Sequence, residues 1–377
     1  MSKPVILHIC LSHGWGGLEM YPIRVGSEFL KRGYKVYGLC IRGTQVAKGM
    51  KEHGIDTFEV DSKISLIIKQ LFKLNHWLNK RQISIIHSHK SGDIIIPALL
   101  TLLTKRCSFF TEHMGVTRPK TDLFHKWVYS HLDRVFSISN ETYRRNLKAL
   151  PLDAGKISQL WLGTDVSLSP TIPADEVAKI KQELSIPNES LVIGNVGRIC
   201  IGKGQGELLE AFSLLQDTDT YPNLHLLLVG GLDVSEGSEN NFVASIKARI
   251  QELQFKDRVH LVGYRKDTSR MLAIMDIVCL PNHNEAFGLT AIEAMAAQKA
   301  IIGANTGSLP EVLGETALLC TPTDPDSISK QLEKYLTSTT LRDINSNLAH
   351  QRALNEFSME AHISKLTEHY TNKNGIL

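Results

Sequence analysis

The chain has 377 residues, of which 42% are hydrophobic and 21% charged, enough to form the cores of two ordinary domains. No stretch approaches the roughly 18–20 apolar residues of a membrane helix, and Met1–Pro4 lead directly into a strand, so neither a membrane span nor a signal peptide is expected. Six widely separated cysteines with no Cys-x-x-Cys pair predict buried thiols in a reducing, cytoplasmic compartment instead of a disulfide framework or zinc site.

The net charge of +3 hides an asymmetry between the two halves of the chain. Residues 1–165 hold 24 Lys and Arg against 13 Asp and Glu, whereas residues 166–377 hold 18 against 26. One interpretation is a pair of ordinary solvated surfaces. The other is a basic first half that faces an anionic membrane, as a peripheral protein on its inner face, or a phosphate-bearing acceptor. A nucleic-acid partner is not expected, because the basic residues are not interleaved with exposed aromatic side chains in a known motif.

Strands and helices alternate along the first half. Residues 5–11 predict an apolar strand, residues 12–19 a glycine-rich loop that opens a helix ending near Gly33, and residues 34–40 the next strand. This β-α-β order predicts a parallel, doubly wound sheet. Further strands are predicted at residues 83–87, 107–111 and 133–139, and a helix begins at Asn140.

A second α/β series follows a linker marked by Pro170 and Pro173. The fold class is therefore α/β, with two Rossmann-like doubly wound domains facing across a cleft. We place an N-terminal domain at residues 1–168 and a C-terminal domain at residues 169–355. Strands of the second series are predicted at residues 191–197, 224–230, 259–263, 276–280 and 300–303, and a final helix at about 359–370.

The most informative stretch is residues 284–295, where Glu285 and Glu293 stand eight positions apart across a strand-to-helix junction. The helix is predicted to begin near Gly288, so the backbone amides of Phe287, Gly288 and Leu289 have no side-chain cap and favour a phosphate. Glu285 can reach a sugar hydroxyl, and Glu293 can accept two hydrogen bonds from a ribose diol. Together these features describe a site for a nucleotide diphosphate sugar.

With Phe-Gly-Leu inside it, this spacing resembles the E-x7-E element of retaining family 4 glycosyltransferases, which belong to glycosyltransferase group 1 and have the GT-B fold. The resemblance covers most of the chain. It implies transfer of a hexosyl unit, with retention of configuration, from a nucleotide diphosphate sugar to a hydroxyl of a glycan or lipid-linked acceptor. It also implies a last helix, about residues 356–377, that packs on the N-terminal domain. The nucleotide sugar is a substrate, so no cofactor is expected, and no metal is expected because no Asp-x-Asp ends a strand.

A second element of the resemblance follows the strand at residues 191–197. Gly197 closes that strand, and Arg198 and Lys203 bracket a flexible glycine-containing loop suited to a diphosphate. In the family this pair neutralises the departing nucleotide diphosphate. We therefore assign Arg198, Lys203 and Glu285 to catalysis, and Gly197 to donor binding.

Other positions of the second half fit the family less closely. Tyr264 follows a strand where the family's backbone reads the nucleotide base, and it is assigned to donor binding. Ser308 replaces the second glycine of the loop usually written G-G-x-P-E, and Asn282 replaces a common serine. These departures affect details of the donor site.

The glycine-rich loop of the first half also matches the family. Gly16 and Gly17 lie where the family places a glycine pair beside the donor phosphate, and a plain tight turn is the alternative. Trp15 replaces a smaller residue and is assigned to the acceptor side.

Four polar residues of the first half follow predicted strands. His113 matches a histidine that, in the family, hydrogen-bonds the hydroxymethyl group of the transferred sugar, and a polar plug at a strand end is the alternative. Glu112 beside it is assigned to acceptor contact. His87 and His89 stand at the family's His-x-His position and are assigned to the acceptor side, with a packing role for one of them as the alternative. A zinc site is not expected, because no further ligand is apparent nearby in the sequence.

Two basic amphipathic stretches, Lys63–Arg81 and Arg118–Arg134, allow two interpretations. Both can be helices that cover the sheet, or they can dock peripherally on anionic lipid.

The predicted function is that of a metal-independent hexosyltransferase using a UDP-sugar, the commoner donor in the family, in lipopolysaccharide or surface polysaccharide synthesis. Two alternatives share the fold: a nucleotide-sugar 2-epimerase, and a non-catalytic nucleotide-sugar-binding protein. The acid/base carboxylates of an epimerase are not found, and every charged element of a transferase is present.

Overall fold

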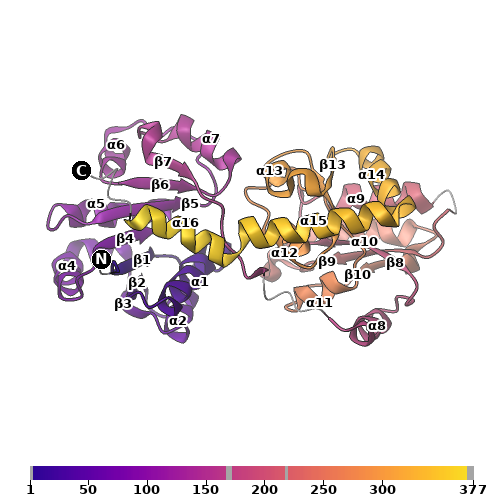
Figure 1. Cartoon of the computed structure of the whole chain (residues 1–377), viewed down its shortest axis with the longest axis horizontal. Helices are drawn as coiled ribbons and strands as arrows, with labels where there is room; N and C mark the ends of the chain where they lie inside the picture. Colours follow the sequence, from indigo (N-terminus) through magenta and orange to yellow (C-terminus); the bar gives the residue numbers. More distant parts are fainter. Residues whose placement is uncertain (1–2, 167–171, 217–219, 372–377) are drawn as a thin grey trace. The chain divides into compact units, whose positions relative to one another are not determined.

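The computed structural model describes residues 3–166, 172–216 and 220–371, and the chain divides into two compact units (Figure 1). The first unit comprises residues 1–163 and 359–377, and the second comprises residues 164–358. The boundary predicted between residues 168 and 169, and the predicted linker residue Pro170, lie outside the described residues. None of the described helices combines the length and apolar character needed to cross a membrane.

The first unit is built on a seven-stranded parallel sheet with the order β3-β2-β1-β4-β5-β6-β7. The sequence analysis missed its edge strands β3 and β7, because neither has the continuous apolar run of a strand buried on both faces. The strands are β1 (Ile6–Cys10), β2 (Val36–Ile41), β3 (Asp56–Val60), β4 (Ile85–Ser88), β5 (Cys107–Glu112), β6 (Arg134–Ser137) and β7 (Ile157–Gln159).

Helices cover the sheet of the first unit, and α16 is packed across it (Figure 1). Only part of the predicted 118–134 stretch is helical, because Asp122 caps α6 and β6 begins at Arg134. The helical elements are α1 (Gly17–Lys31), α2 (Gln45–Glu52), α3 (Lys63–Ser65), the π-helical turn η1 (Leu66–Gln70), α4 (Leu71–Lys80), η2 (Ser91–Asp93), α5 (Ile95–Thr101), α6 (Leu123–Ser130), α7 (Asn140–Ala149), η3 (Ala154–Lys156) and α16 (Met359–Thr371).

The two faces of this sheet differ in chemistry, because successive residues of a strand point to opposite faces. Leu7 and Ile9 of β1 join an apolar core with Leu74 and Leu78 of α4. His8, between them, faces the other side, where its ring lies against α1. One face is therefore apolar, and the other carries polar side chains.

The second unit contains a six-stranded parallel sheet with the order β10-β9-β8-β11-β12-β13. The predicted α/β class with two doubly wound sheets is confirmed. The strands are β8 (Leu191–Val196), β9 (Leu224–Val229), β10 (Val259–Leu261), β11 (Ile277–Leu280), β12 (Ala300–Ala304) and β13 (Leu318–Cys320). The helical elements are α8 (Ala174–Glu183), α9 (Gln205–Gln216), η5 (Val234–Glu236), α10 (Asn240–Glu252), η6 (Lys256–Arg258), α11 (Thr268–Ala273), α12 (Leu289–Ala296), α13 (Leu309–Leu313), η7 (Gly314–Thr316), α14 (Pro325–Thr337) and α15 (Thr339–Phe357).

Candidate active site

The predicted donor residues of the second unit gather at the carboxyl ends of β8 and β11. These strands are neighbours at the point where the strand order reverses, which is where doubly wound sheets bind ligands. Gly197 and Arg198 follow β8, and Glu285 lies between β11 and α12. The fold therefore brings the two halves of the predicted donor site to one place.

The loop between β8 and α9, predicted to be flexible, packs at its two ends. Gln205 Nε2 donates to the Arg198 carbonyl oxygen at 2.9 Å. Gly204 has a φ of 76°, and a Cβ at this residue would lie 2.2 Å from the Pro281 carbonyl oxygen. Glycine is therefore required for this loop to pack against the segment that follows β11. The Arg198 side chain itself is exposed.

Lys203 and Glu285, which the sequence analysis assigned to different parts of the donor, form an ion pair. The Lys203 Nζ lies 2.7 Å from Glu285 Oε2, and Asn282 Nδ2 donates to the same oxygen at 2.9 Å. The departure from the family at Asn282 thus supplies a donor that orients Glu285. A bound diphosphate would compete with this carboxylate for the lysine ammonium group.

The N-terminus of α12 has the form predicted from the sequence. The helix begins at Leu289, and no side chain caps it. Gly288 has a φ of 91°, and a Cβ there would lie 2.9 Å from Leu309 Cδ2, so the turn into the helix depends on glycine. The Phe287 side chain is buried. Glu293 is partly buried on α12, about one turn from the helix start.

The loop before α13 supports Glu285 through its backbone. Gly307 has a φ of 64°, and a Cβ at this residue would lie 2.7 Å from the Glu285 backbone. Ser308 has a φ of −88°, which any residue can adopt, and its backbone N donates to the Glu285 carbonyl oxygen at 3.0 Å. The replacement of the second glycine by serine therefore brings no backbone strain. Tyr264, after β10, is 57% exposed, and no described contact ties its side chain to this group.

In the first unit, the predicted phosphate-side glycines form the start of α1. Gly16 is the N-cap residue, Gly17 is the first helical residue, and no side chain caps the helix. The φ of −176° at Gly16 is extended, so this backbone does not by itself require glycine. Ser12 Oγ donates to Glu19 Oε1 at 2.7 Å across the loop. Trp15 is 52% exposed.

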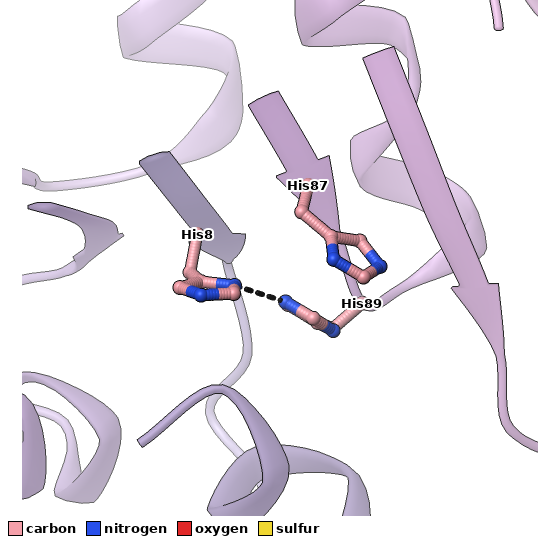
Figure 2. A group of neighbouring side chains, drawn as sticks. All are labelled: His8, His87 and His89. Carbon is pink, nitrogen blue, oxygen red and sulfur yellow. Dashed lines mark hydrogen bonds between the residues drawn. The ribbon is translucent and has the colours of Figure 1, made fainter. Parts of the chain in front are cut away.

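The two histidines assigned to the acceptor side are part of a buried cluster on one face of the sheet. His8 and His87 are register partners on β1 and β4, and His89 lies two residues beyond His87 on the same face. His8 Nδ1 and His89 Nε2 are 2.9 Å apart, and they share a hydrogen bond (Figure 2). All three are buried: His87 lies within β4, and His89 lies just beyond its end.

His113 is also buried, at the end of β5, against the ring of Tyr21 of α1. Burial lowers the pKa of His113 to about 3, so its imidazole is neutral at pH 7. Its Nε2 has no hydrogen-bond partner among the described residues. A buried nitrogen without a partner is a place where a ligand hydroxyl can bind. Glu112 beside it accepts from the Met114 backbone N at 3.1 Å, and burial raises its pKa.

Two protein-family models match this chain, one in each half. The family model described as Glycosyltransferase Family 4 matches residues 15–168, and the one described as Glycosyl transferases group 1 matches residues 176–352. The chain belongs to glycosyltransferase family 4. The predicted family is therefore confirmed.

Curated relatives of this glycosyltransferase carry several names. It is 29% identical to D-inositol 3-phosphate glycosyltransferase of Corynebacterium glutamicum (strain R), over 57% of this chain and 52% of that protein. It is 25% identical to UDP-Gal:alpha-D-GlcNAc-diphosphoundecaprenol alpha-1,3-galactosyltransferase of Escherichia coli, over 81% of this chain and 80% of that protein. The aligned part spans about half the length of the corynebacterial relatives.

Solved structures confirm the GT-B fold of the glycosyltransferase. A glycosyltransferase from Rickettsia africae ESF-5 has a TM-score of 0.87 at 21% identity, covering 100% of this chain and 99% of that one. Anabaena Alr3699/HepE in complex with UDP has a TM-score of 0.83 at 19% identity, covering 98% and 100%. At these identities the likeness shows the fold alone.

Sequence reasoning missed several residues that shape the site of the glycosyltransferase. Gln205 fixes the Arg198 loop, and Tyr21 packs on His113. Tyr21 also bonds through its hydroxyl to His362 Nε2 at 2.8 Å, and His362 Nδ1 donates to the Trp161 carbonyl oxygen at 2.7 Å. These residues come from helices and carry no motif. A periodic helix pattern with a polar residue on its buried face is the signal that could have found them.

Proposed function

We propose that this glycosyltransferase is a retaining hexosyltransferase that uses a nucleotide diphosphate sugar as its donor. The observation that carries the proposal is the Lys203–Glu285 ion pair beside the uncapped start of α12, at the switch point of the second sheet. Cations and free amides suit a diphosphate, and the adjacent carboxylate suits sugar hydroxyls.

In the proposed reaction, the bond between the anomeric carbon and the diphosphate oxygen breaks, and a bond to the acceptor oxygen forms on the same face. The acceptor proton passes to the departing phosphate oxygen, so no carboxylate acts as a nucleophile. Arg198, Lys203 and the amides of residues 287–289 stabilise the charge on the leaving group. Glu285 holds sugar hydroxyls, and Glu293 holds the ribose. The side chains of Arg198 and Lys203 would supply the positive charge that a metal ion supplies in other transferases. The reaction is therefore proposed to proceed in the presence of EDTA.

We assign His113 to the transferred sugar by the family resemblance. Because the His113 imidazole is neutral, it can form a hydrogen bond with the hydroxymethyl group without bringing a charge into the site. The buried, unpartnered Nε2 supports this role.

A UDP-sugar is the proposed donor, and a thermal-shift experiment tests it. We expect UDP to raise the melting temperature of the purified protein without added metal, and GDP and ADP to have a smaller effect, because binding to the native state stabilises it. The UDP and UDP-glucose complexes of the structural neighbour support this choice. A shift with GDP alone would move the proposal to a guanosine donor. No shift with any nucleotide would contradict the donor site.

The proposed acceptor is a hydroxyl of a glycan or a lipid-linked glycan of the cell surface. Support comes from the E. coli relative, whose name specifies a diphosphoundecaprenol-linked acceptor. Product analysis with and without such an acceptor tests the assignment. Conversion of the donor sugar to its 2-epimer in the absence of an acceptor would instead indicate an epimerase.

Peripheral binding to anionic membranes is proposed for the α3–α4 segment of the first unit. Ile64, Ile68 and Phe72 recur every four residues and are 70%, 73% and 76% exposed. The sequence contains no acidic residue between Asp61 and Asp93, although it contains six Lys and Arg there. An exposed apolar stripe among basic residues fits an anionic lipid surface.

In a flotation assay we expect the protein to rise with vesicles that contain anionic lipid. With neutral vesicles at the same ionic strength it should remain in the bottom fraction. Ile68→Glu should abolish flotation, because it places a carboxylate in the apolar stripe. Ile344→Glu is the matched control, since Ile344 is 51% exposed on α15 of the second unit. Absence of flotation at low salt would remove the membrane proposal and leave the transferase proposal intact.

A further inference from the structure

The buried histidine cluster carries an inference that is independent of the transferase reaction. Three imidazoles come together on the polar face of the first sheet: His8 from β1, His87 from β4 and His89 just beyond β4 (Figure 2). One ring nitrogen from each lies within 4.8 Å of the others. The rings are fixed by the strands that carry them, because His8 and His87 are direct register partners.

We propose that His8, His87 and His89 bind one Zn²⁺ ion, with the Tyr370 hydroxyl as the fourth ligand. Tyr370 belongs to α16, and its hydroxyl lies 2.6 Å from His87 Nδ1. Three imidazole nitrogens and one oxygen form a set typical of zinc, and neither calcium nor magnesium prefers nitrogen ligands.

The protonation state of the cluster suits a metal. Burial lowers the pKa of His8 to about 3 and holds those of His87 and His89 well below 6.5. At pH 7 each ring is therefore neutral and keeps one lone pair. Zinc binding would move the proton of the His8–His89 hydrogen bond to an outer ring nitrogen, so the imidazoles release no proton. One proton leaves if Tyr370 binds as the phenolate.

The surrounding hydrogen bonds fit the same ion. The second nitrogen of His87 bonds to Thr111 Oγ1 at 2.8 Å, as the outer nitrogen of a metal-bound histidine usually does. The outer nitrogens His8 Nε2 and His89 Nδ1 are buried without a partner among the described residues. An ion on the inner nitrogens leaves an N–H at each of these two outer nitrogens, so the site also requires buried water beside the rings to accept them.

The movement that the ion requires is small. Zinc–nitrogen bonds of about 2.0–2.1 Å place tetrahedral ligand nitrogens about 3.3 Å apart. The His8–His89 pair at 2.9 Å and the His87–Tyr370 pair at 2.6 Å must each open slightly, and the three imidazole nitrogens, now within 4.8 Å of one another, must draw together around the ion. Because the three side chains are almost completely inaccessible to solvent, the ion would be taken up as the chain folds. It would tie β1, β4 and α16 together and need not take part in sugar transfer.

The test is to measure zinc in the full chain, expressed with zinc and dialysed against a weak chelator. We expect one ion per chain in the wild type and none in His89→Gln. The matched control is His260→Gln, because His225 Nδ1 and His260 Nε2 form a 2.9 Å pair in the second unit that offers only two ligands. This variant should retain the ion. Zinc in the wild type that does not exceed the His89→Gln level would overturn the proposal, and so would loss of zinc from His260→Gln.

A second measurement needs no variant and covers the case in which His89→Gln fails to fold. Cobalt-substituted wild type should show the intense visible bands of a tetrahedral ion, and X-ray absorption at the cobalt edge should count three imidazoles. A count of two or none would contradict the site, whatever the variants do. Neither measurement depends on the donor assignment, so its failure would be distinct from a failure of the proposed function.

Discussion

Replacing Lys203 with alanine is expected to lower kcat by about 10²–10³-fold, with a much smaller change in the KM for the donor. The reason is that its ammonium group neutralises charge that develops on the diphosphate only as the glycosidic bond breaks. Arg198→Ala should behave in the same way. Glu293→Ala should instead raise the donor KM and leave kcat nearly unchanged, because a ribose contact is equally strong in the ground state and in the transition state. Steady-state kinetics with the donor identified by thermal shift measures all three.

Lys266→Ala is the matched control for this prediction, because Lys266 is an exposed lysine in the same unit. We expect it to change neither kcat nor KM. Lys203→Ala should remain folded, since neither side chain of the Lys203–Glu285 pair is fully buried and Asn282 Nδ2 still donates to Glu285 Oε2 in the variant. Near-normal kcat in both Lys203→Ala and Arg198→Ala would show that the donor site is wrongly assigned.

The parts of the donor site that the sequence predicted are local in the chain. The start of α12 at Leu289, its missing cap and the position of Glu285 just before it all depend on a dozen consecutive residues. Such features follow from turn chemistry and helix periodicity. The parallel, doubly wound class of both sheets also follows, because short β-α-β connections leave few parallel topologies.

The parts that could not be predicted depend on contacts between distant segments. Lys203 and Glu285 are 82 residues apart, and their ion pair exists because Gly204 lets two loops meet at the switch point. His8 and His87 are 79 residues apart in the sequence and adjacent in the sheet. A search for a third zinc ligand near His87 and His89 in the sequence therefore missed His8. Strand register, not sequence spacing, sets this contact.

The first unit is expected to unfold on mild acidification, with a midpoint at about pH 5. Five imidazoles are buried there: His8, His87, His89, His113 and His362. Burial lowers the pKa of His8 and His113 to about 3 and of His362 to about 4, and the pKa values of His87 and His89 lie well below 6.5.

The sign of the effect follows from the protons bound by each state. Below pH 6.5 the unfolded chain protonates these histidines and the native unit does not, so the free energy of unfolding falls as pH falls. Each group contributes up to about 1.4 kcal/mol per pH unit, and five together contribute up to about 7 kcal/mol per pH unit. A domain stability of roughly 5–15 kcal/mol is then lost within one or two pH units. The loss begins near pH 6.5 and would continue down to the native pKa values.

Tryptophan fluorescence measures this unit alone, because Trp15, Trp77, Trp127 and Trp161 are the four tryptophans of the chain and all precede residue 164. The titration is done in a chelator, so that the imidazoles are free of metal. Far-ultraviolet circular dichroism reports both units, and it should retain a fraction of its signal after the fluorescence change is complete. In the second unit His225 and His260 are the histidines whose pKa values burial lowers, and both are less deeply buried than the five of the first unit.

The variant that isolates the cause is the double replacement of His8 and His89 with glutamine. It removes both partners of one hydrogen bond and should reduce the pH dependence of unfolding, measured by urea titration between pH 7 and pH 5, by about two protons. The matched control is His76→Gln, which replaces an exposed histidine on α4. A fluorescence transition that begins only below about pH 4, where ordinary carboxylates titrate, would show that the histidines are not the cause.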